Sequence, residues 1–176
     1  MPDQIDSVLP DLVDPNLLVL FCGSAASTKS SILKAYYAGP GNRFWWTLHE
    51  IGLTPCLLRP DMFRELSKYN IGLTDLAKYS SGPDHTLPTG SYNSNLLSQK
   101  LNRFAPSVLA FNGKTPAQNF LQQKTQYGRQ QNRHGDTVIF VLPSTSGAAR
   151  RYWSIEPWRE LAEFTKTFEP SRKTPC

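Results

Sequence analysis

The sequence of 176 residues has few cysteines, and no two of them form a Cys-x-x-Cys pair. Three widely separated thiols cannot assemble a zinc ribbon or a cysteine-ligated iron–sulfur cluster within one chain. The three histidines also lack the spacing that is typical of paired metal ligands. The cysteine and histidine patterns therefore predict neither a zinc site nor an iron–sulfur cluster. The cysteines are Cys22, Cys56 and Cys176.

Long hydrophobic runs are also absent. The best candidate, Leu17 to Cys22, has six residues, whereas a membrane-spanning helix needs about 18. The first residues are acidic and lack the basic start of a secretory signal. We therefore expect a cytoplasmic protein, nucleoid-associated if bacterial, with no membrane partner. The length suits one domain, with an N-terminal arm at 1–16, the domain at 17–168 and a flexible tail at 169–176.

Short apolar runs alternate with segments of helical pattern. The runs at 17–22, 107–113 and 137–142 are continuous, as in strands buried on both faces of a parallel sheet. This alternation predicts a three-layer α/β/α fold with a central, mostly parallel sheet of about four strands. Helices are expected at 42–51, 61–69, 96–104, 117–123 and 157–168.

The predicted strands end in small, polar loops at Gly23–Ser30, Asn112–Lys114 and Pro143–Arg150. In open α/β sheets, ligands bind outside the carboxyl ends of the strands. The sequence therefore predicts a site at this edge. The net charge of +5 is a modest indication of nucleic-acid binding. We expect a positive edge formed by Arg129, Arg133 and Arg150.

Five motifs occur in order along the chain. They are Phe21-Cys-Gly-Ser-Ala-Ala-Ser27, Tyr36-Tyr-Ala-Gly-Pro-Gly-Asn-Arg-Phe-Trp45, Ile71-Gly-Leu-Thr-Asp75, Phe111-Asn-Gly-Lys114 and Val141-Leu-Pro-Ser-Thr-Ser-Gly-Ala-Ala-Arg150. Their order and spacing resemble the uracil-DNA glycosylase superfamily, and the closest branch is the mismatch-specific uracil/thymine-DNA glycosylases. The resemblance covers about residues 17 to 165 and implies a monofunctional enzyme of base excision repair, which flips a damaged base out of DNA and hydrolyses its N-glycosidic bond without a metal or a redox cofactor. We also expect a monomer.

The first motif departs from the family pattern. In the family, an Asn in a segment resembling G-x-N-P-G positions the attacking water, and Ala25 stands at that place here. An alanine methyl group cannot orient water. The backbone N–H groups of the Gly23–Ser27 loop could instead stabilise the departing base anion. The resemblance places Gly23, Ala26, Ser27, Ser30 and Tyr37 around the base, with Ser24 and Ala25 at catalytic positions.

Two asparagines are candidates for the missing polar group. A branch directed at deaminated purines resembles this chain and relies on an asparagine in its N-x-F-W segment and another after the middle strand. Asn42 and Asn112 match these positions. Asn42 is also a good helix cap, and Asn112-Gly is a common turn. The sequence leaves two roles open for Asp75, which could face the site or cap the backbone.

The last motif resembles the loop that enters the minor groove of DNA. Ser144 replaces the usual Asn or His, and the serine-rich run resembles thymine-directed members. The serines would bind phosphates that flank the lesion, and Arg150 would fill the gap left by the flipped nucleotide or pair with a phosphate. Tyr37 would stack on the base. The predicted DNA contacts are Ser144, Thr145, Ser146, Gly147, Ala148 and Arg150.

Two other functions remain open. A protein that binds damaged DNA without cutting would explain Ala25. A hydrolase for a small nucleoside or an ester could use the same fold. The preferred base is also open among uracil, thymine, hypoxanthine and xanthine, because discrimination rests on one or two hydrogen bonds. The preference for single- or double-stranded DNA is open as well.

Overall fold

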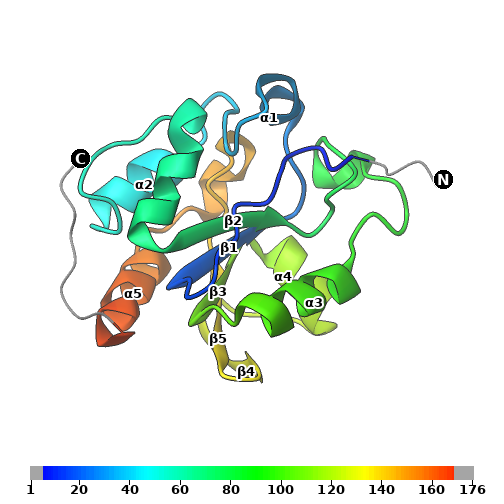
Figure 1. Ribbon diagram of the computed structural model, residues 1–176. Helices are drawn as coiled ribbons and strands as arrows, with labels where there is room; N and C mark the ends of the chain where they lie inside the picture. Colours follow the sequence, from blue (N-terminus) through cyan, green and yellow to red (C-terminus); the bar gives the residue numbers. More distant parts are fainter. Residues whose placement is uncertain (1–5, 169–176) are drawn as a thin grey trace.

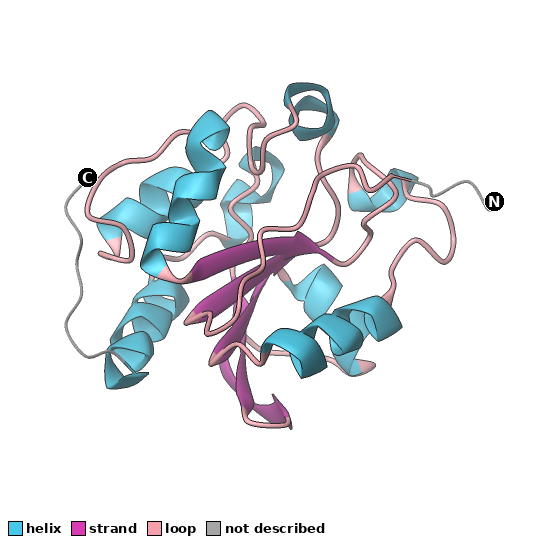
Figure 2. Ribbon diagram, in the orientation of Figure 1, coloured by secondary structure: helices cyan, strands magenta, loops and turns pink. Residues whose placement is uncertain are grey.

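The computed structural model describes residues 6–168, which form a five-stranded sheet with helices on both faces (Figure 1 and Figure 2). The strand order is β2-β1-β3-β5-β4, and β4 alone is antiparallel to its neighbour. The predicted α/β/α class is confirmed, with five strands where about four were expected. The strands are β1 Val19–Gly23, β2 Ile71–Asp75, β3 Val108–Asn112, β4 Gly128–His134 and β5 Thr137–Leu142.

Helices cover both faces of the sheet. In Figure 1, α2 and α5 lie on one side of the strands, and α3 and α4 lie on the other. Helical segments occur at all five expected places, although 60–69 is a 3₁₀ helix, η1. The α-helices are α1 Thr28–Leu33, α2 Phe44–Glu50, α3 Ser94–Phe104, α4 Lys114–Leu121 and α5 Glu156–Thr165. The other 3₁₀ helices are η2 Asp84–Thr86, η3 Gly147–Tyr152 and η4 Lys166–Phe168.

Alternate residues of β1, β3 and β5 enter two separate cores. In β1, Val19 and Phe21 pack with residues of α2, η1 and α5. Leu20 and Cys22 point to the other face and pack with residues of α3 and α4. Because both faces are covered, these strands are apolar at successive positions instead of alternating with polar residues. The sheet is therefore a rigid support for the loops at its ends.

The N-terminal arm runs from residue 6 to residue 16 without helix, with a bend at 8–9 and a turn at 15–16. Leu12 forms an antiparallel bridge with Leu73 of β2, and the Leu9 side chain is buried. A Cβ atom at Gly72 would lie 2.7 Å from the Leu12 carbonyl oxygen, so β2 needs glycine where the arm crosses it. The arm thereby covers the β2 edge of the sheet. Residues 1–5 and the expected tail at 169–176 lie outside the described residues.

The expectations about a membrane partner and a metal site can be compared with the described residues, 6–168. Across residues 6–168, no helix is long and apolar enough to cross a membrane. The same residues contain no cluster of three His, Cys, Asp or Glu side chains that could hold a metal ion.

Candidate active site

Four neighbouring strands, β2, β1, β3 and β5, end side by side. Gly23 and Asp75 are register partners at the ends of β1 and β2. Asn112 ends β3, and its register partner is Leu142 at the end of β5. Because these strands are parallel, the loops that follow β1, β3 and β5 leave the same edge of the sheet. The candidate site is built on this edge.

The loop after β1 is fixed by its own backbone and by two serines. The carbonyl oxygens of Gly23 and Ser24 accept hydrogen bonds from Leu76 and Ala77, which continue β2. Ser27 caps α1, because its Oγ accepts from the backbone N–H of Ser30 at 3.0 Å. The buried Ser30 Oγ accepts from the Ser27 hydroxyl and from the Ala38 N–H, each at 3.0 Å.

The fixed loop carries the predicted first motif. Ser24 and Ala25 are half-buried there, Ala26 is buried and Ser27 is exposed. Ser30 ties this loop to the segment that carries Tyr37. The serines at positions 27 and 30 therefore have structural hydrogen bonds, and their predicted contact with the base stays a prediction.

Gly23 allows three parts of the site to meet. A Cβ atom at this position would lie 2.7 Å from the Asp75 Oδ1 and 3.4 Å from the Tyr37 hydroxyl oxygen. The first distance is too short for two non-bonded atoms, so any side chain would displace the carboxylate. Glycine is therefore required by the close approach of Asp75. The carboxylate and the phenol both face the end of β1.

Tyr37 is held in a strained conformation against Phe44. Its φ angle is +54°, which is a rare conformation for a bulky aromatic residue. Its ring stacks on Phe44, with the ring centroids 3.9 Å apart and the planes 25° apart. Phe44 therefore covers one face of the Tyr37 ring. Strain of this kind is found at functional sites, where the surrounding structure maintains it.

The Tyr37 hydroxyl is buried, and it has no hydrogen-bond partner among residues 6–168. Burial raises its pKa well above the ordinary value, and the Asp75 carboxylate raises it further, while the nearby Asn112 amide opposes the rise. The group therefore stays a neutral hydroxyl at physiological pH. A buried hydroxyl without a partner can donate a hydrogen bond to a ligand.

The Nδ2 and the Oδ1 of the Asn112 amide both form hydrogen bonds with Thr145. The Asn112 Nδ2 donates to the Thr145 Oγ1 at 2.9 Å, and the Thr145 N–H donates to the Asn112 Oδ1 at 3.0 Å. The Thr145 carbonyl oxygen also accepts from the Arg43 N–H at 2.9 Å. Thr145 thereby joins β3, the loop after β5 and the start of α2. This predicted DNA contact is only 1% exposed, so its side chain fixes the loop from inside.

Asn42 lies one residue before Arg43, which is the N-cap of α2, and its side chain forms a hydrogen bond just ahead of the helix. Its Oδ1 accepts from the Phe44 N–H at 2.9 Å, at the first turn of α2. This bond helps to set the position of Phe44 and hence of the stacked Tyr37 ring. The amides of Asn42 and Asn112 thus both form structural hydrogen bonds. Their catalytic roles stay predictions.

The loop after β5 lies against the loop at 39–41. A Cβ atom at Gly147 would lie 2.9 Å from the Pro40 carbonyl oxygen, so only glycine fits this contact. Ser146 caps η3, with its Oγ accepting from the Ala148 N–H at 3.3 Å. Arg150 is exposed, and one of its guanidinium nitrogens would be 3.0 Å from a Cβ atom at Gly41. The half-buried Ser144 accepts from the Ser146 N–H.

Cationic and aromatic side chains surround this edge of the sheet. Lys114 begins α4 directly after β3, and its Nζ lies 4.5 Å from the centre of the Tyr127 ring. Arg150 and the strongly exposed Tyr152 belong to η3. Arg133 is elsewhere, because the antiparallel register pairs it with Val138 near the start of β5. The expected positive edge therefore does not run from Arg133 to Arg150.

Asp75 is the site residue for which sequence reasoning gave no definite role. It is 6% exposed, and burial raises the pKa of its carboxyl from 3.8 to about 6. Lys78 and Lys100 lower this pKa, whereas Asp11 raises it. The available signal was a single carboxylate at the end of the apolar segment Ile71-Gly-Leu-Thr-Asp75. That pattern alone does not distinguish a ligand-binding group from a backbone cap.

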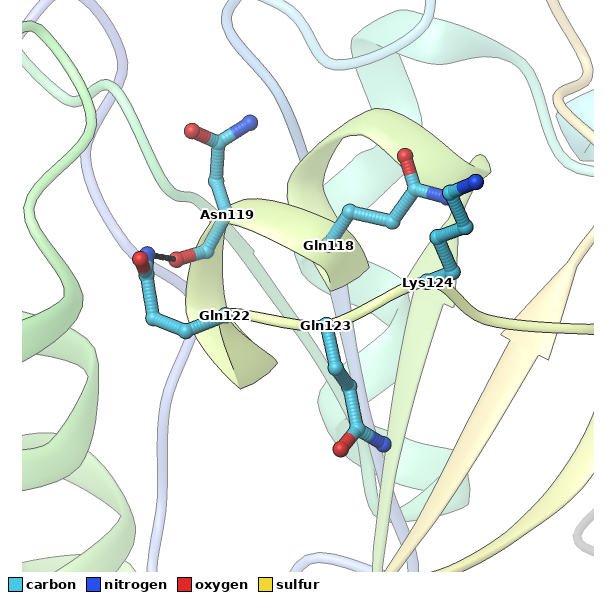
Figure 3. A pocket seen from close by; sticks show the side chains of 5 residues that line it. All are labelled: Gln118, Asn119, Gln122, Gln123 and Lys124. Carbon is cyan, nitrogen blue, oxygen red and sulfur yellow. Dashed lines mark hydrogen bonds between the residues drawn. The ribbon is translucent and has the colours of Figure 1, made fainter.

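A surface hollow of about 340 Å³ lies away from these groups (Figure 3). The hollow lies beside the last turn of α4 and the segment that follows it. The first turn of α4, in contrast, follows the end of β3. The lining of the hollow is polar, and Figure 3 shows a bond from the Gln122 amide to the Asn119 carbonyl. None of the predicted site residues lines it. The lining residues are Gln118, Asn119, Gln122, Gln123 and Lys124.

Comparison with known proteins gives two findings. The family model described as "Uracil DNA glycosylase superfamily" matches residues 10–168. A protein from Methanosarcina acetivorans, provisionally described as a uracil DNA glycosylase, has a solution NMR structure with a TM-score of 0.64 to this chain. The two sequences are 24% identical, and the match covers 92% of this chain and 97% of that one. This second likeness concerns the fold.

Proposed function

The chain belongs to the uracil DNA glycosylase superfamily, and from this premise we propose that it is a monofunctional glycosylase for uracil or another deaminated base in DNA. Membership supports hydrolase chemistry, DNA glycosylase activity and a role in DNA repair in general. The choice of base, its flipping and the use of the residues below are our proposal. We further propose that the enzyme acts as a cytoplasmic monomer without a cofactor.

The position of Tyr37 carries this proposal. The ring is covered by Phe44 on one face, and its hydroxyl lies beside the ends of β1 and β2. A base that has left the duplex would stack on the other face, with its polar edge toward the strand ends. Stacking of a base on an aromatic ring is worth about 1–3 kcal/mol. The ring can bind different bases, so the polar groups around it would select among them.

The second support is the connection between the strand ends beside Tyr37 and the Arg150 loop. Thr145 is bound to Asn112 at the end of β3 and precedes the exposed part of the loop. Arg150, Ser144 and Ser146 would contact the strand from which the base is extruded. A rigid connection sets the distance between the flipped base and these phosphates. The same unit would therefore hold the DNA and receive the base.

Single-turnover excision followed by alkaline cleavage tests the proposal. Labelled oligonucleotides would carry uracil, thymine, hypoxanthine or xanthine, each in duplex and in single strand. Alkali-dependent strand breakage at one of these bases is the expected result, because a monofunctional glycosylase leaves an abasic site. Strand cleavage without alkali would contradict the monofunctional activity. No cleavage with any substrate, but retained binding, would identify a damage-binding protein instead.

Arg150→Ala separates the proposal from hydrolysis of small nucleosides. The variant should weaken DNA binding and slow excision at subsaturating enzyme. Arg103→Ala is the matched control, because Arg103 lies in the last turn of α3, which leads to the opposite edge of the sheet. A nucleoside hydrolase would cleave free deoxyuridine or deoxyinosine, and Arg150→Ala would leave that rate unchanged.

A further inference from the structure

Asp75 has an unusual environment for a buried carboxylate. It takes part in none of the side-chain hydrogen bonds or ion pairs among residues 6–168, although two lysines lie nearby. A buried charge without hydrogen bonds is unfavourable, so such groups are normally paired or replaced. Its Oδ1 faces the end of β1, next to the equally unpartnered Tyr37 hydroxyl. Two such groups side by side indicate a ligand-binding position.

The nearby lysines use their hydrogen bonds elsewhere. Lys78 donates to Asp11 at 2.8 Å, to the Leu9 carbonyl at 2.7 Å and to the Tyr36 hydroxyl at 3.1 Å. These three contacts exhaust the three donors of an ammonium group. Lys100 binds Asp11 at 2.5 Å and the Thr74 hydroxyl at 3.1 Å. The lysines therefore act on Asp75 through their charge only.

The charge balance of this cluster favours an ionised Asp75 at neutral pH. Asp11 neutralises one of the two lysines that it binds, and an ionised Asp75 would neutralise the other. Burial opposes ionisation, and the pKa of Asp75 is about 6 as a result. A carboxylate with such a pKa is ionised at neutral pH and can still accept a proton. The titratable groups that interact with it electrostatically are Asp11, Cys22, Tyr36, Tyr37, Lys78 and Lys100.

The rest of the site leaves a role for this carboxylate. Ala25 cannot bind water where the family motif has an asparagine. Asn42 uses its Oδ1 on the Phe44 N–H, and Asn112 uses both ends of its amide on Thr145. Asp75 is close to Gly23, the residue that opens the first motif. It is therefore an acceptor near the base pocket without a protein partner.

We propose that Asp75 is a catalytic residue, the base that binds and activates the attacking water in place of the missing asparagine. This inference rests on the proposed glycosylase function. The Asp75 carboxylate accepts a proton from water while the water oxygen bonds to C1′ of the deoxyribose. The C1′–N bond breaks at the same time, and its electron pair leaves with the base. The base anion then takes up a proton from solvent.

Single-turnover excision by the wild type, Asp75→Asn and Asp75→Ala between pH 5 and pH 8 tests this role. The wild-type rate should rise with pH through about 6 and then level off, because only the ionised carboxylate accepts a proton. Asp75→Ala should lose about 10²–10⁴-fold in rate. Asp75→Asn should keep more activity than Asp75→Ala, because its oxygen can still orient water. The excision rate of Asp75→Asn should not change around pH 6.

Asp136→Asn is the matched control, because it removes one carboxylate from the exposed β4–β5 turn. It should keep both the wild-type rate and the pH profile. The inference would be overturned if Asp75→Ala excised the base as fast as the wild type, or if Asp75→Asn kept the wild-type pH profile. Either result would leave the glycosylase function intact. A wild-type rate that falls as pH rises would also overturn the inference. Absence of excision by the wild type would overturn both proposals.

Discussion

A catalytic carboxylate in a buried position should reduce the stability of the protein that carries it. The pKa of Asp75 is raised by burial from 3.8 to about 6, so the folded protein binds this proton more tightly than the unfolded chain. For such a group, stability is highest below pH 4 and falls as pH rises from about 4 to 6. The loss is on the order of 3 kcal/mol for this shift. Asp11 acts in the opposite sense, because its pKa is lowered.

Asp75→Asn should therefore stabilise the protein at neutral pH. We expect its free energy of unfolding to match the wild type near pH 4 and to exceed it above pH 7, by up to about 3 kcal/mol. Urea denaturation of both proteins between pH 4 and pH 8 measures this difference, and the Asp11 contribution cancels in the comparison. A variant that is less stable than the wild type at pH 8 would mean that the carboxylate has a structural partner. Greater stability with slower excision would fit a residue kept for function.

At the scale of elements, the Asn112–Thr145 pair joins the end of β3 to the loop that carries Arg150. Asn112→Ala removes both hydrogen bonds and leaves the buried Thr145 N–H and hydroxyl without partners. We expect a loss of about 1–3 kcal/mol in unfolding free energy. The loop carrying Arg150 should also lose its fixed position, so the affinity for lesion-containing DNA should fall. Fluorescence anisotropy with labelled duplexes measures this second effect.

Thr137→Val is a suitable control for that experiment. Its hydroxyl donates to the Pro106 carbonyl at 2.7 Å, in a buried contact at the start of β5. The change should lower stability by a comparable amount, because it also leaves a buried polar atom unsatisfied. DNA affinity should stay at the wild-type value, since this contact lies at the other end of the strand. Equal losses of affinity in both variants would mean that general destabilisation is responsible.

The sequence predicts some of these elements and not others for identifiable reasons. β1, β3 and β5 are buried on both faces, so their continuous apolar runs are visible in the sequence. β4 is an edge strand whose residues are mostly exposed and polar, so its sequence resembles a loop. β2 contains Gly72 and Asp75 and is buried in part by the N-terminal arm. Contacts between segments about 60 residues apart cannot be recognised from local pattern.

The same limit applies to the site. Tyr37 and Asn112 could be singled out because they stand in motifs or at predicted strand ends. The pairing of Asn112 with Thr145 spans 33 residues, and the approach of Asp75 to Gly23 depends on the register of β1 and β2. A residue's type and neighbours in sequence give neither fact. Motif comparison therefore predicts where the site lies, whereas the hydrogen bonds indicate which of its polar groups lack partners.

At the scale of the whole molecule, the position of the positive charges matters more than their number. The sequence favours a path for DNA along Arg129, Arg133 and Arg150. The β4–β5 register instead places Arg133 near the start of β5, opposite the edge that carries the loop. Lys114 and Arg150 both lie at the strand ends, with the exposed Tyr152 beside Arg150. We therefore expect the DNA backbone to follow Lys114 and Arg150.

Salt dependence distinguishes the two paths. Each lost phosphate contact should reduce the slope of log affinity against log salt by about 1. Lys114→Ala and Arg150→Ala should each show this reduction between about 50 and 200 mM salt, whereas Arg133→Ala should keep the wild-type slope. Each of the three variants loses one positive charge, so a general effect of net charge would change their three slopes equally. A reduced slope for Arg133→Ala and not for Lys114→Ala would place the DNA along β4, as the sequence alone suggests.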